Sequence, residues 1–376
     1  MRHNSLAISL SEEQGMLLDS AREFCRSRSD IFAVRELLAS ETGFDTKVWR
    51  ELVALGWMGV AVPEAYGGSG LGIGSAIPIV ECMGKQLLST PFITATLVAQ
   101  ALQRGGSAQQ CEEFLPAIAD GKVVTLALLE SEDWGEQDVS LTAKTVEGGL
   151  ELVGGKTQVA YAAVAEQFLI SAMNEGQRRL LLVPAAALPA GAIIPQASID
   201  ETRRTARVDF SGTVISAQNL LPGDADAVIR DVSLIAALLY AAEATGSASA
   251  CLDVTVEYLK TRKQFGRLIG SYQSLKHPMV EVLCAVDAAR SFIYHAATVL
   301  PEGPLDADGE IACRMAKAQA SEALKYAGDR AVQFHGGMGF TYECDAQLYI
   351  RRAQWSQQVY GDAYHHRKRL AALLLD

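Results

Sequence analysis

The sequence predicts an α+β protein in which a helical region, a β-region and a second helical region follow one another. Residues 1–120 and 223–376 carry apolar side chains at the three- and four-residue steps of helices that pack on one face. Residues 121–222 consist of short runs that are β-branched or alternate in polarity, and glycine and proline separate these runs. We therefore expect an N-terminal α-helical domain, a middle antiparallel β-domain and a C-terminal four-helix-bundle domain with these boundaries.

The last region contains four long helical patterns. Short links that contain glycine or proline join them, so consecutive helices should run antiparallel and form a bundle. The expected helices cover residues 224–263, 273–300, 306–335 and 345–374.

The composition narrows the class of protein. Of the 376 residues, 49% are hydrophobic and 20% are charged, which is typical of a soluble globular protein. The net charge of -11 argues against nucleic acid as a partner, and no apolar run approaches the roughly 20 residues that cross a membrane. The seven cysteines show neither a CxxC pair nor metal-like spacing, and the opening MRHNSLAISLSEEQ is too polar for a signal peptide. We expect a cytoplasmic protein with reduced thiols and no metal.

One carboxylate lies in an unusually apolar helix. In LIAALLYAAEATGSASA (234–250), Glu243 is the only side chain that is charged at neutral pH. Burial of an unpaired carboxylate costs several kcal/mol, roughly, so such a residue is paired or has a function. Glu243 is therefore either a base in a dry site, where a carboxylate becomes more basic, or part of an ion pair with an arginine of another helix.

Two segments have the residues of an anion-binding surface. YLKTRKQFGRLIGSYQSLKHP (258–278) ends one helix with Arg262 and Lys263, crosses a loop with two glycines and begins the next helix near Gln273. Helix ends with glycines and basic side chains suit a phosphate, although an ordinary solvated loop has the same composition. QFHGGMGFTYECDAQLYIRRAQ (333–354) offers a run of small residues that lets the backbone approach a ligand, or forms a plain glycine turn.

Together with LGWMGVAVPEAYGGSGLG (55–72), these segments resemble the acyl-CoA dehydrogenase family over nearly the whole chain. YLKTRKQFGRLIGSYQ is similar to the family's Tyr-x-x-x-Arg-x-Gln-Phe-Gly stretch with its downstream Gln, and QFHGGMGFTYE to its Gln-x-x-Gly-Gly-x-Gly-Phe stretch. The resemblance implies that FAD lies between the β-domain and the last bundle, with its ADP part reaching a neighbouring subunit. By position, the implied FAD-binding residues are Arg262, Gln264, Phe265, Gln273, Gln333, Gly336 and Gly337.

The β-domain departs from the family pattern where it should touch the flavin ring. LLESEDWGEQDVS stands in place of a Thr-Glu-Pro…Gly-Ser segment and keeps only Glu130. KTQVAYA stands in place of Lys-x-Trp-Ile-Thr and keeps Lys156 but neither Trp nor Thr. Backbone amides of these segments are still available to a flavin.

The catalytic base departs from the pattern as well. Many members have Tyr-Glu-Gly-Thr near the C-terminus, whereas QVYGDAYHHRKR has Gly361 after Tyr360, and Asp362 is one position on and one methylene shorter. Other members take the base from the long helix, at the position of Ala236, two turns before Glu243. Glu243 is therefore the first candidate for the base, and Asp362 is the alternative.

The resemblance implies α,β-dehydrogenation of an acyl-CoA thioester to a 2-enoyl-CoA. A carboxylate would remove the α-proton while flavin N5 accepts hydride from the β-carbon, and an electron-transfer flavoprotein would take up the electrons. The chain would form a homodimer or homotetramer, or a heterotetramer with a paralogous subunit. Because both departures affect the reaction centre, the alternative is a base-less structural and FAD-sharing subunit of a heteromeric acyl-CoA dehydrogenase. Neither interpretation includes nucleic acid or a membrane as a partner.

Overall fold

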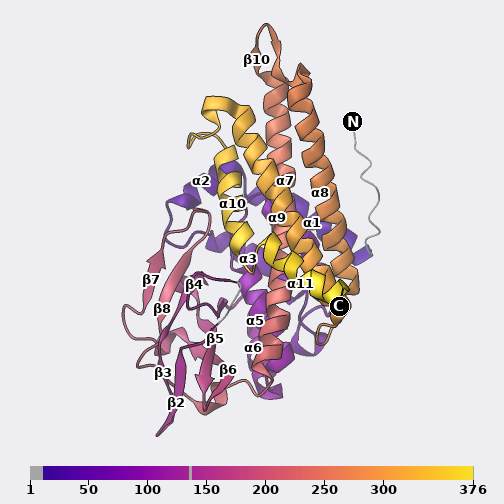
Figure 1. Ribbon diagram of the computed structural model, residues 1–376. Coiled ribbons are helices and arrows are strands. Elements are labelled where there is room, and N and C mark those ends of the chain that lie inside the picture. The colour runs from indigo at the N-terminus through magenta and orange to yellow at the C-terminus, as the bar shows by residue number, and fades with distance from the viewer. Residues whose placement is uncertain (1–11, 135–137, 376) are drawn as a thin grey trace.

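Helices precede and follow a β-region along the chain, which confirms the predicted fold class (Figure 1). The computed structural model describes residues 12–134 and 138–375. The strands between Val124 and Ile215 lie to one side of the long C-terminal helices, and the N-terminal helices pack behind them. The domain boundaries at 120 and 222 stay a prediction.

The N-terminal helices begin at side-chain caps where the chain offers them. Asp30 accepts a hydrogen bond from the amide of Ala33 and begins one helix, and Ser107 forms a capping box with Gln110 at another. Two of these helices, α4 and α5, are almost wholly buried and pack against the C-terminal region. The described N-terminal helices are α1 (Glu12–Arg28), α2 (Ile31–Leu38), α3 (Thr46–Ala54), α4 (Ala76–Lys85), α5 (Phe92–Gly105) and α6 (Ala108–Ala119).

The β-domain has a core of its own, in which the rings of Phe168 and Phe210 meet edge to face at 5.7 Å. In the described part of the chain, β1, β5, β2, β3 and β9 lie side by side in one sheet, with β6 also paired to β5, and β4, β8 and β7 form a second sheet. The strands are β1 (Val124–Ala127), β2 (Thr142–Val146), β3 (Gly149–Val153), β4 (Gly155–Ala160), β5 (Gln167–Asn174), β6 (Gln177–Pro184), β7 (Ile193–Gln196), β8 (Thr205–Asp209) and β9 (Val214–Ile215).

The prediction of a wholly antiparallel β-domain was wrong at one strand. β5 runs parallel to β1 and to β2, whereas the other pairs in the two sheets are antiparallel. A parallel pair requires a long connection between its strands. Strands β2 to β4 lie between β1 and β5 in the chain and supply that connection, which the local pattern of short alternating runs does not reveal.

The C-terminal region differs from the prediction at its last helix. The expected helix 345–374 is interrupted between Gln358 and Ala363, because Tyr360 (φ +54°) and Gly361 (φ +94°) adopt left-handed backbone conformations. The described elements are α7 (Ala225–Thr261), the hairpin of β10 (Lys263–Gln264) and β11 (Arg267–Leu268), α8 (Gln273–Val299), α9 (Ala307–His335), α10 (Ala346–Gln358) and α11 (Ala363–Leu375).

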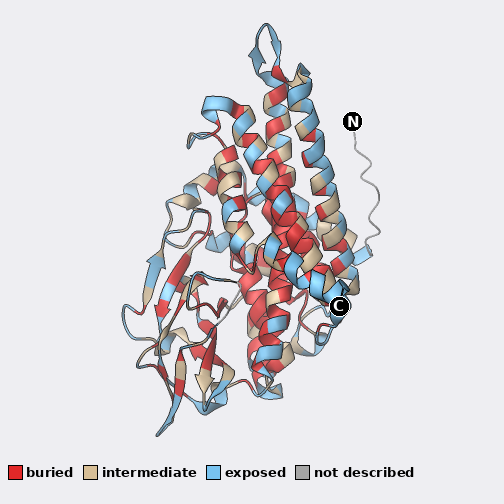
Figure 2. Ribbon diagram, viewed as in Figure 1, coloured by how far each residue is buried: buried red, intermediate tan, exposed pale blue. Residues whose placement is uncertain are grey.

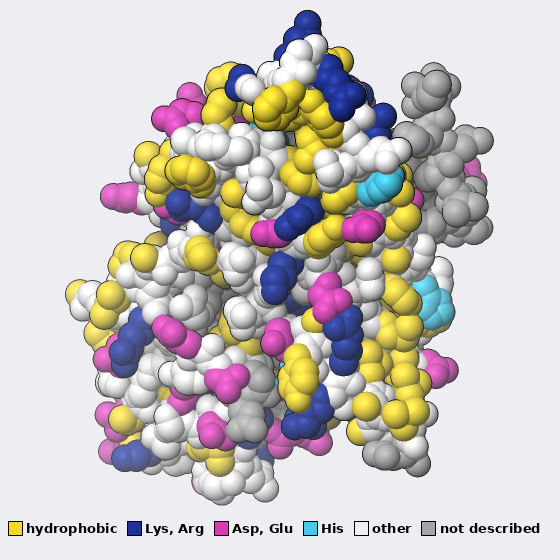
Figure 3. All heavy atoms as spheres, turned by 45° about the horizontal axis from the view of Figure 1, so that its top comes forward, with side chains coloured by type: hydrophobic (Ala, Val, Ile, Leu, Met, Phe, Trp, Pro, Cys, Tyr) yellow, Lys and Arg dark blue, Asp and Glu magenta, His cyan; other side chains and the backbone are white. Residues whose placement is uncertain are grey.

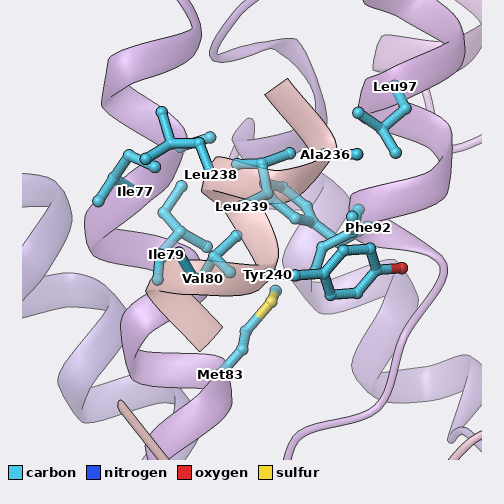
Figure 4. Close-up of a cluster of buried hydrophobic side chains, with 14 of the residues drawn as sticks. Ile77, Ile79, Val80, Met83, Phe92, Leu97, Ala236, Leu238, Leu239 and Tyr240 are labelled. Atoms are coloured by element: carbon cyan, nitrogen blue, oxygen red, sulfur yellow. The ribbon is translucent and has the colours of Figure 1, made fainter. Parts of the chain in front are cut away.

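Helix α7 is the centre of the molecule. Figure 2 shows buried residues along its middle and along the helices around it. Its small residues allow α4 to cross at close range, since a Cβ atom at Gly246 would collide with the carbonyl oxygen of Glu81. Apolar side chains of α4, α5 and α7 interlock at this crossing, among them Ile79, Phe92 and Leu239 (Figure 4). None of the described helices is long and apolar enough to span a membrane.

The close crossing of α4 and α7 predicts a cost for Gly246→Ala. The added methyl group meets backbone atoms that cannot rotate away, so we expect the free energy of unfolding to fall by about 1–3 kcal/mol. Urea unfolding measures this change, with Gly303→Ala as the control because nothing lies within 4 Å of a Cβ atom built there. Equal stability of Gly246→Ala and the parent protein would contradict the close approach of the two helices.

Candidate reaction centre and cofactor-binding surface

Glu243 lies at the centre of a buried cluster of charges. Its side chain is 3% exposed and forms ion pairs with Arg203, which precedes β8, and with Arg352 of α10, the latter at 3.5 Å. Asp200 forms ion pairs with the same two arginines, at 3.6 Å to Arg203. Two carboxylates and two guanidinium groups compensate one another here. Glu243 is therefore in the ion-pair arrangement, the second of the two interpretations that the sequence left open.

The charges of this cluster are strongly coupled. Burial alone would raise the pKa of Asp200, but the guanidinium groups of Arg352 and Arg203 outweigh burial and hold that pKa below its usual range. The hydroxyl of Thr202 donates to Asp200 at 2.6 Å and accepts a hydrogen bond from Arg352 at 2.5 Å. A carboxylate that is already compensated by two arginines, as Glu243 is, is poorly placed to accept a proton from a substrate.

Four aromatic side chains pack next to the charge cluster. The Arg203 guanidinium lies over the ring of Trp355 at 4.7 Å, and Trp355 meets Tyr240 edge to face at 5.2 Å. Tyr240 stacks on Tyr360 at 5.8 Å, and Tyr360 packs against Trp134 at 4.5 Å. The aromatic group formed by Trp134, Tyr240, Trp355 and Tyr360 thus joins the chain at Trp134 to α7, α10 and the turn after α10.

The aromatic group leaves little free space at the place that the resemblance assigns to the flavin ring. There, Gln158 and Ala160 of β4 face the aromatic group across a cavity of about 30 Å³, and a cavity of about 10 Å³ lies behind it beside Arg203. One water molecule needs about 10–15 Å³ of such space, so the two cavities hold at most a few water molecules. Among the described residues that line these two cavities, none is an aspartate or a glutamate.

Two open grooves lie outside the aromatic group, and Trp134 lines both of them as well as the larger inner cavity. The first groove, of about 520 Å³, contains Asp362 and His365 and two further acidic residues, Glu132 and Asp133. Asp362 also caps α11, since the amide of His365 donates to its carboxylate at 2.7 Å. The second groove, of about 570 Å³, is lined by the arginines 178, 230, 314 and 369.

The predicted FAD-binding residues gather at one exposed end of the molecule. The ring of Tyr258 near the end of α7 stacks on His335 at the end of α9 at 4.2 Å, so the hairpin after α7 and the glycine turn after α9 share this end (Figure 1). Figure 3 shows Lys and Arg side chains gathered there. All seven predicted residues are exposed: Arg262, Gln264, Phe265, Gln273, Gln333, Gly336 and Gly337.

Phe265 is a large hydrophobic side chain in this group and is almost fully exposed. It is 90% exposed at the tip of the hairpin, and it has a left-handed backbone conformation (φ +52°) followed by Gly266 (φ +76°). An aromatic residue in this conformation is strained. Strained backbone of this kind gathers at functional sites such as ligand clamps, which agrees with the role that the resemblance assigns to this hairpin.

Comparison with known proteins identifies the family. The chain matches the acyl-CoA dehydrogenase N-terminal domain over residues 11–122 and the acyl-CoA dehydrogenase C-terminal domain over residues 234–375. It is 31% identical to acyl-CoA dehydrogenase IpdE2 of Mycolicibacterium smegmatis, over 96% of this chain and 99% of that protein. The chain therefore belongs to the acyl-CoA dehydrogenase family, flavoprotein oxidoreductases of lipid metabolism whose cofactor is FAD.

Solved structures agree with this assignment. The chain superimposes on a chain of the ChsE4-ChsE5 complex from Mycobacterium tuberculosis with a TM-score of 0.88 and 26% identity, over 99% of both chains. Butyryl-CoA dehydrogenase from Megasphaera elsdenii has the same fold, with a TM-score of 0.87 and 24% identity over 99% of this chain and 100% of that chain.

The chain fits one part of FAD and not the other. The exposed hairpin, with the guanidinium groups of Arg262 and Arg267 and the amides of the glycine turn, suits the anionic pyrophosphate of a dinucleotide. The inner cavity of about 30 Å³ does not fit a three-ring flavin while the aromatic group stays in place. Sequence reasoning missed the residues that close it, because Tyr240 and Trp355 have the pattern of ordinary helix core.

The charge cluster predicts that Glu243→Gln lowers stability. The substitution leaves Arg203 and Arg352 with Asp200 as their remaining carboxylate, and removal of one member of a buried ion pair costs about 3–5 kcal/mol. Urea unfolding measures the loss, and Glu257→Gln on the exposed face of the same helix is the control, with little expected change. A fully stable Glu243→Gln protein would contradict the structural role and favour the catalytic one.

Acid is expected to destabilise the protein through His366. The pKa of this imidazole is lowered to about 3, mainly because the ring is buried and also because the positive charges of Lys317 and Arg314 lie nearby. The unfolded chain takes up that proton below about pH 6.5 and the folded chain does not, so stability falls as the pH falls from about 6.5 to about 3, by at most about 1.4 kcal/mol per pH unit. Urea unfolding at several pH values should show a shallower loss for His366→Gln and an unchanged loss for the exposed His277→Gln.

Proposed function

We propose that this chain is a structural and FAD-sharing subunit of a heteromeric acyl-CoA dehydrogenase. The observation that supports the proposal is the narrow inner cavity, around which four aromatic side chains pack at the place that the resemblance assigns to the flavin ring. No described carboxylate reaches the inner cavities, and Glu243 is bound to two arginines. A chain with this centre completes an enzyme whose base and flavin ring lie in another subunit.

The exposed FAD-binding surface supports a shared cofactor. Arg262, Gln273 and Gly336 are exposed and lie at the ends of α7, α8 and α9, where a neighbouring chain can reach them. In the proposed assembly they bind the pyrophosphate and adenosine of FAD that the partner subunit holds. The related ChsE4-ChsE5 structure is a complex of two named chains, which is consistent with such an arrangement.

In this assembly the partner subunit supplies the carboxylate that removes the α-proton of an acyl-CoA, and FAD supplies the hydride acceptor. The product is a 2-enoyl-CoA, and an electron-transfer flavoprotein takes the electrons onward. We also propose a cytoplasmic location, because all seven cysteines are free thiols.

A second candidate is dehydrogenation at this chain's own centre, with Glu243 or Asp362 as the base. The second groove favours it, because its volume of about 570 Å³ is that of a ligand site and its four arginines suit the phosphates of a CoA thioester. This groove reaches Trp134 and Tyr360, and Asp362 lies in the neighbouring groove. This candidate requires the aromatic group to move.

Purification of the tagged chain from its source, followed by mass spectrometry of what accompanies it, separates the two candidates. We expect a paralogous chain to accompany it, a yellow complex that acyl-CoA bleaches under anaerobic conditions, and a colourless product when the chain is expressed alone. A yellow protein from the lone chain that acyl-CoA bleaches, and whose Glu243→Gln or Asp362→Asn variant keeps FAD without bleaching, would establish the second candidate instead.

The shared cofactor also predicts the effect of Arg262→Ala. Loss of the guanidinium removes a charge-assisted bond to a phosphate, so the complex should bind FAD about tenfold to a hundredfold more weakly. Equilibrium dialysis of the complex measures the change. Lys276→Ala, an exposed residue one turn into α8, is the control, and an Arg262→Ala complex with unchanged affinity would place FAD elsewhere.

A further inference from the structure

Lys156 of β4 is a buried lysine whose three donor hydrogens are all bound. The residue is 1% exposed, and its ammonium group donates to the carbonyl of Leu128 at 3.2 Å, to Ser171 at 3.0 Å and to Glu130 at 2.6 Å. A lysine at such a depth is costly unless a carboxylate compensates it. Glu130 is the carboxylate that does so.

Glu130, four residues before Trp134, binds the chain at Ser140 and Leu141 as well as Lys156. One carboxylate oxygen accepts the bond from Lys156 and lies 3.1 Å from the amide of Leu141, and the other accepts from the amide of Ser140 at 2.8 Å and from the Ser140 hydroxyl. One side chain thus ties residue 130 to residues 140 and 141. The ion pair to Lys156 anchors that tie in the core of the β-domain.

Trp134 lies between the tied ends and separates three hollows. It lines the first groove, the second groove and the inner cavity of about 30 Å³, and its ring packs on Tyr360 at 4.5 Å. We propose that the Lys156–Glu130 ion pair is a positioning device that fixes Trp134 between the two grooves. The functional meaning, that this ion pair keeps the chain's own reaction centre closed, rests on the proposed function, whereas the position of Trp134 is measurable without FAD or substrate.

A purely stabilising ion pair is the competing explanation, and it differs in what happens to Trp134. Lys156→Met and Glu130→Gln each break the pair, and both explanations expect a loss of stability in urea unfolding. The positioning role adds a change at Trp134 in the folded protein. The matched control is Lys144→Met, an exposed lysine of β2 in the neighbouring sheet.

Fluorescence isolates the Trp134 signal when each protein is compared with the same protein carrying Trp134→Phe. We expect Lys156→Met and Glu130→Gln to shift the emission of Trp134 to the red and to increase its quenching by acrylamide, and Lys144→Met to leave both unchanged. Unchanged emission and quenching in the folded Lys156→Met and Glu130→Gln proteins would overturn the proposal, whatever their stability.

A pH titration of the parent protein keeps the test decisive if Lys156→Met does not fold. Burial lowers the pKa of Lys156 to about 8, although Glu130 opposes this shift. The Trp134 signal should therefore change near pH 8 as Lys156 loses its proton, and Glu130→Gln should abolish this change because the ion pair is already broken in that variant. Lys317, whose pKa burial lowers to about 7, lies on α9 near Asp362, and its titration is not expected to move with Glu130→Gln.

Two outcomes of the pH titration would contradict the positioning role of the Lys156–Glu130 ion pair. A midpoint that Glu130→Gln leaves in place, or a Trp134 signal that does not change between about pH 6 and 10, would overturn the positioning role. The colour of the purified chain is recorded separately, so a yellow, active lone chain rejects the proposed function without deciding this test. The charged and titratable groups around Lys156 and Trp134 are Glu130, Glu132, Asp133, Arg178, Tyr360, Asp362, His365, Lys368 and Arg369.

Discussion

The compensation of two buried arginines by two buried carboxylates is the constraint on which the rest of this structure depends. Asp200 and Arg203 come from the segment before β8, Glu243 from α7 and Arg352 from α10, so the cluster joins the β-domain to the C-terminal helices. The next residue, Arg204, donates to the carbonyls of Leu37, Leu38 and Ser40 and adds the N-terminal helices to the same junction. None of these charges is easily lost alone, because each would leave a partner buried without compensation.

The aromatic group is built on this junction. Arg203 belongs to the charge cluster and also lies over Trp355, so the aromatic group packs on a guanidinium whose position three domains determine. Four residues before Trp134, Glu130 accepts hydrogen bonds from Lys156 and Ser140. The packing that joins the β-region to the helices and the packing of the aromatic group are therefore continuous.

Local patterns predicted the order of helices and strands, because helical spacing is a short-range signal, and the cofactor role of the Arg-x-Gln-Phe-Gly and Gly-Gly-x-Gly stretches stays a prediction. Local patterns failed where long-range contacts decide. The parallel pairing of β5 depends on strands distant in the chain, and the left-handed turn at Tyr360 interrupts a pattern that reads as one helix. The apolar surroundings of Glu243 were evident from the sequence, but its partners Arg203 and Arg352 lie 40 and 109 positions away.

The turn between α10 and α11 has an evolutionary consequence. Gly361 occupies the position at which many family members carry the catalytic glutamate, and its φ of +94° is one that other residues rarely adopt. A Cβ atom there would lie 2.8 Å from the ring of His365. A mutation that restores the glutamate must therefore be accompanied by a new backbone path and a displaced histidine. In the proposed heteromeric enzyme, this turn makes the loss of the glutamate hard to reverse, because a single substitution at Gly361 does not restore the base.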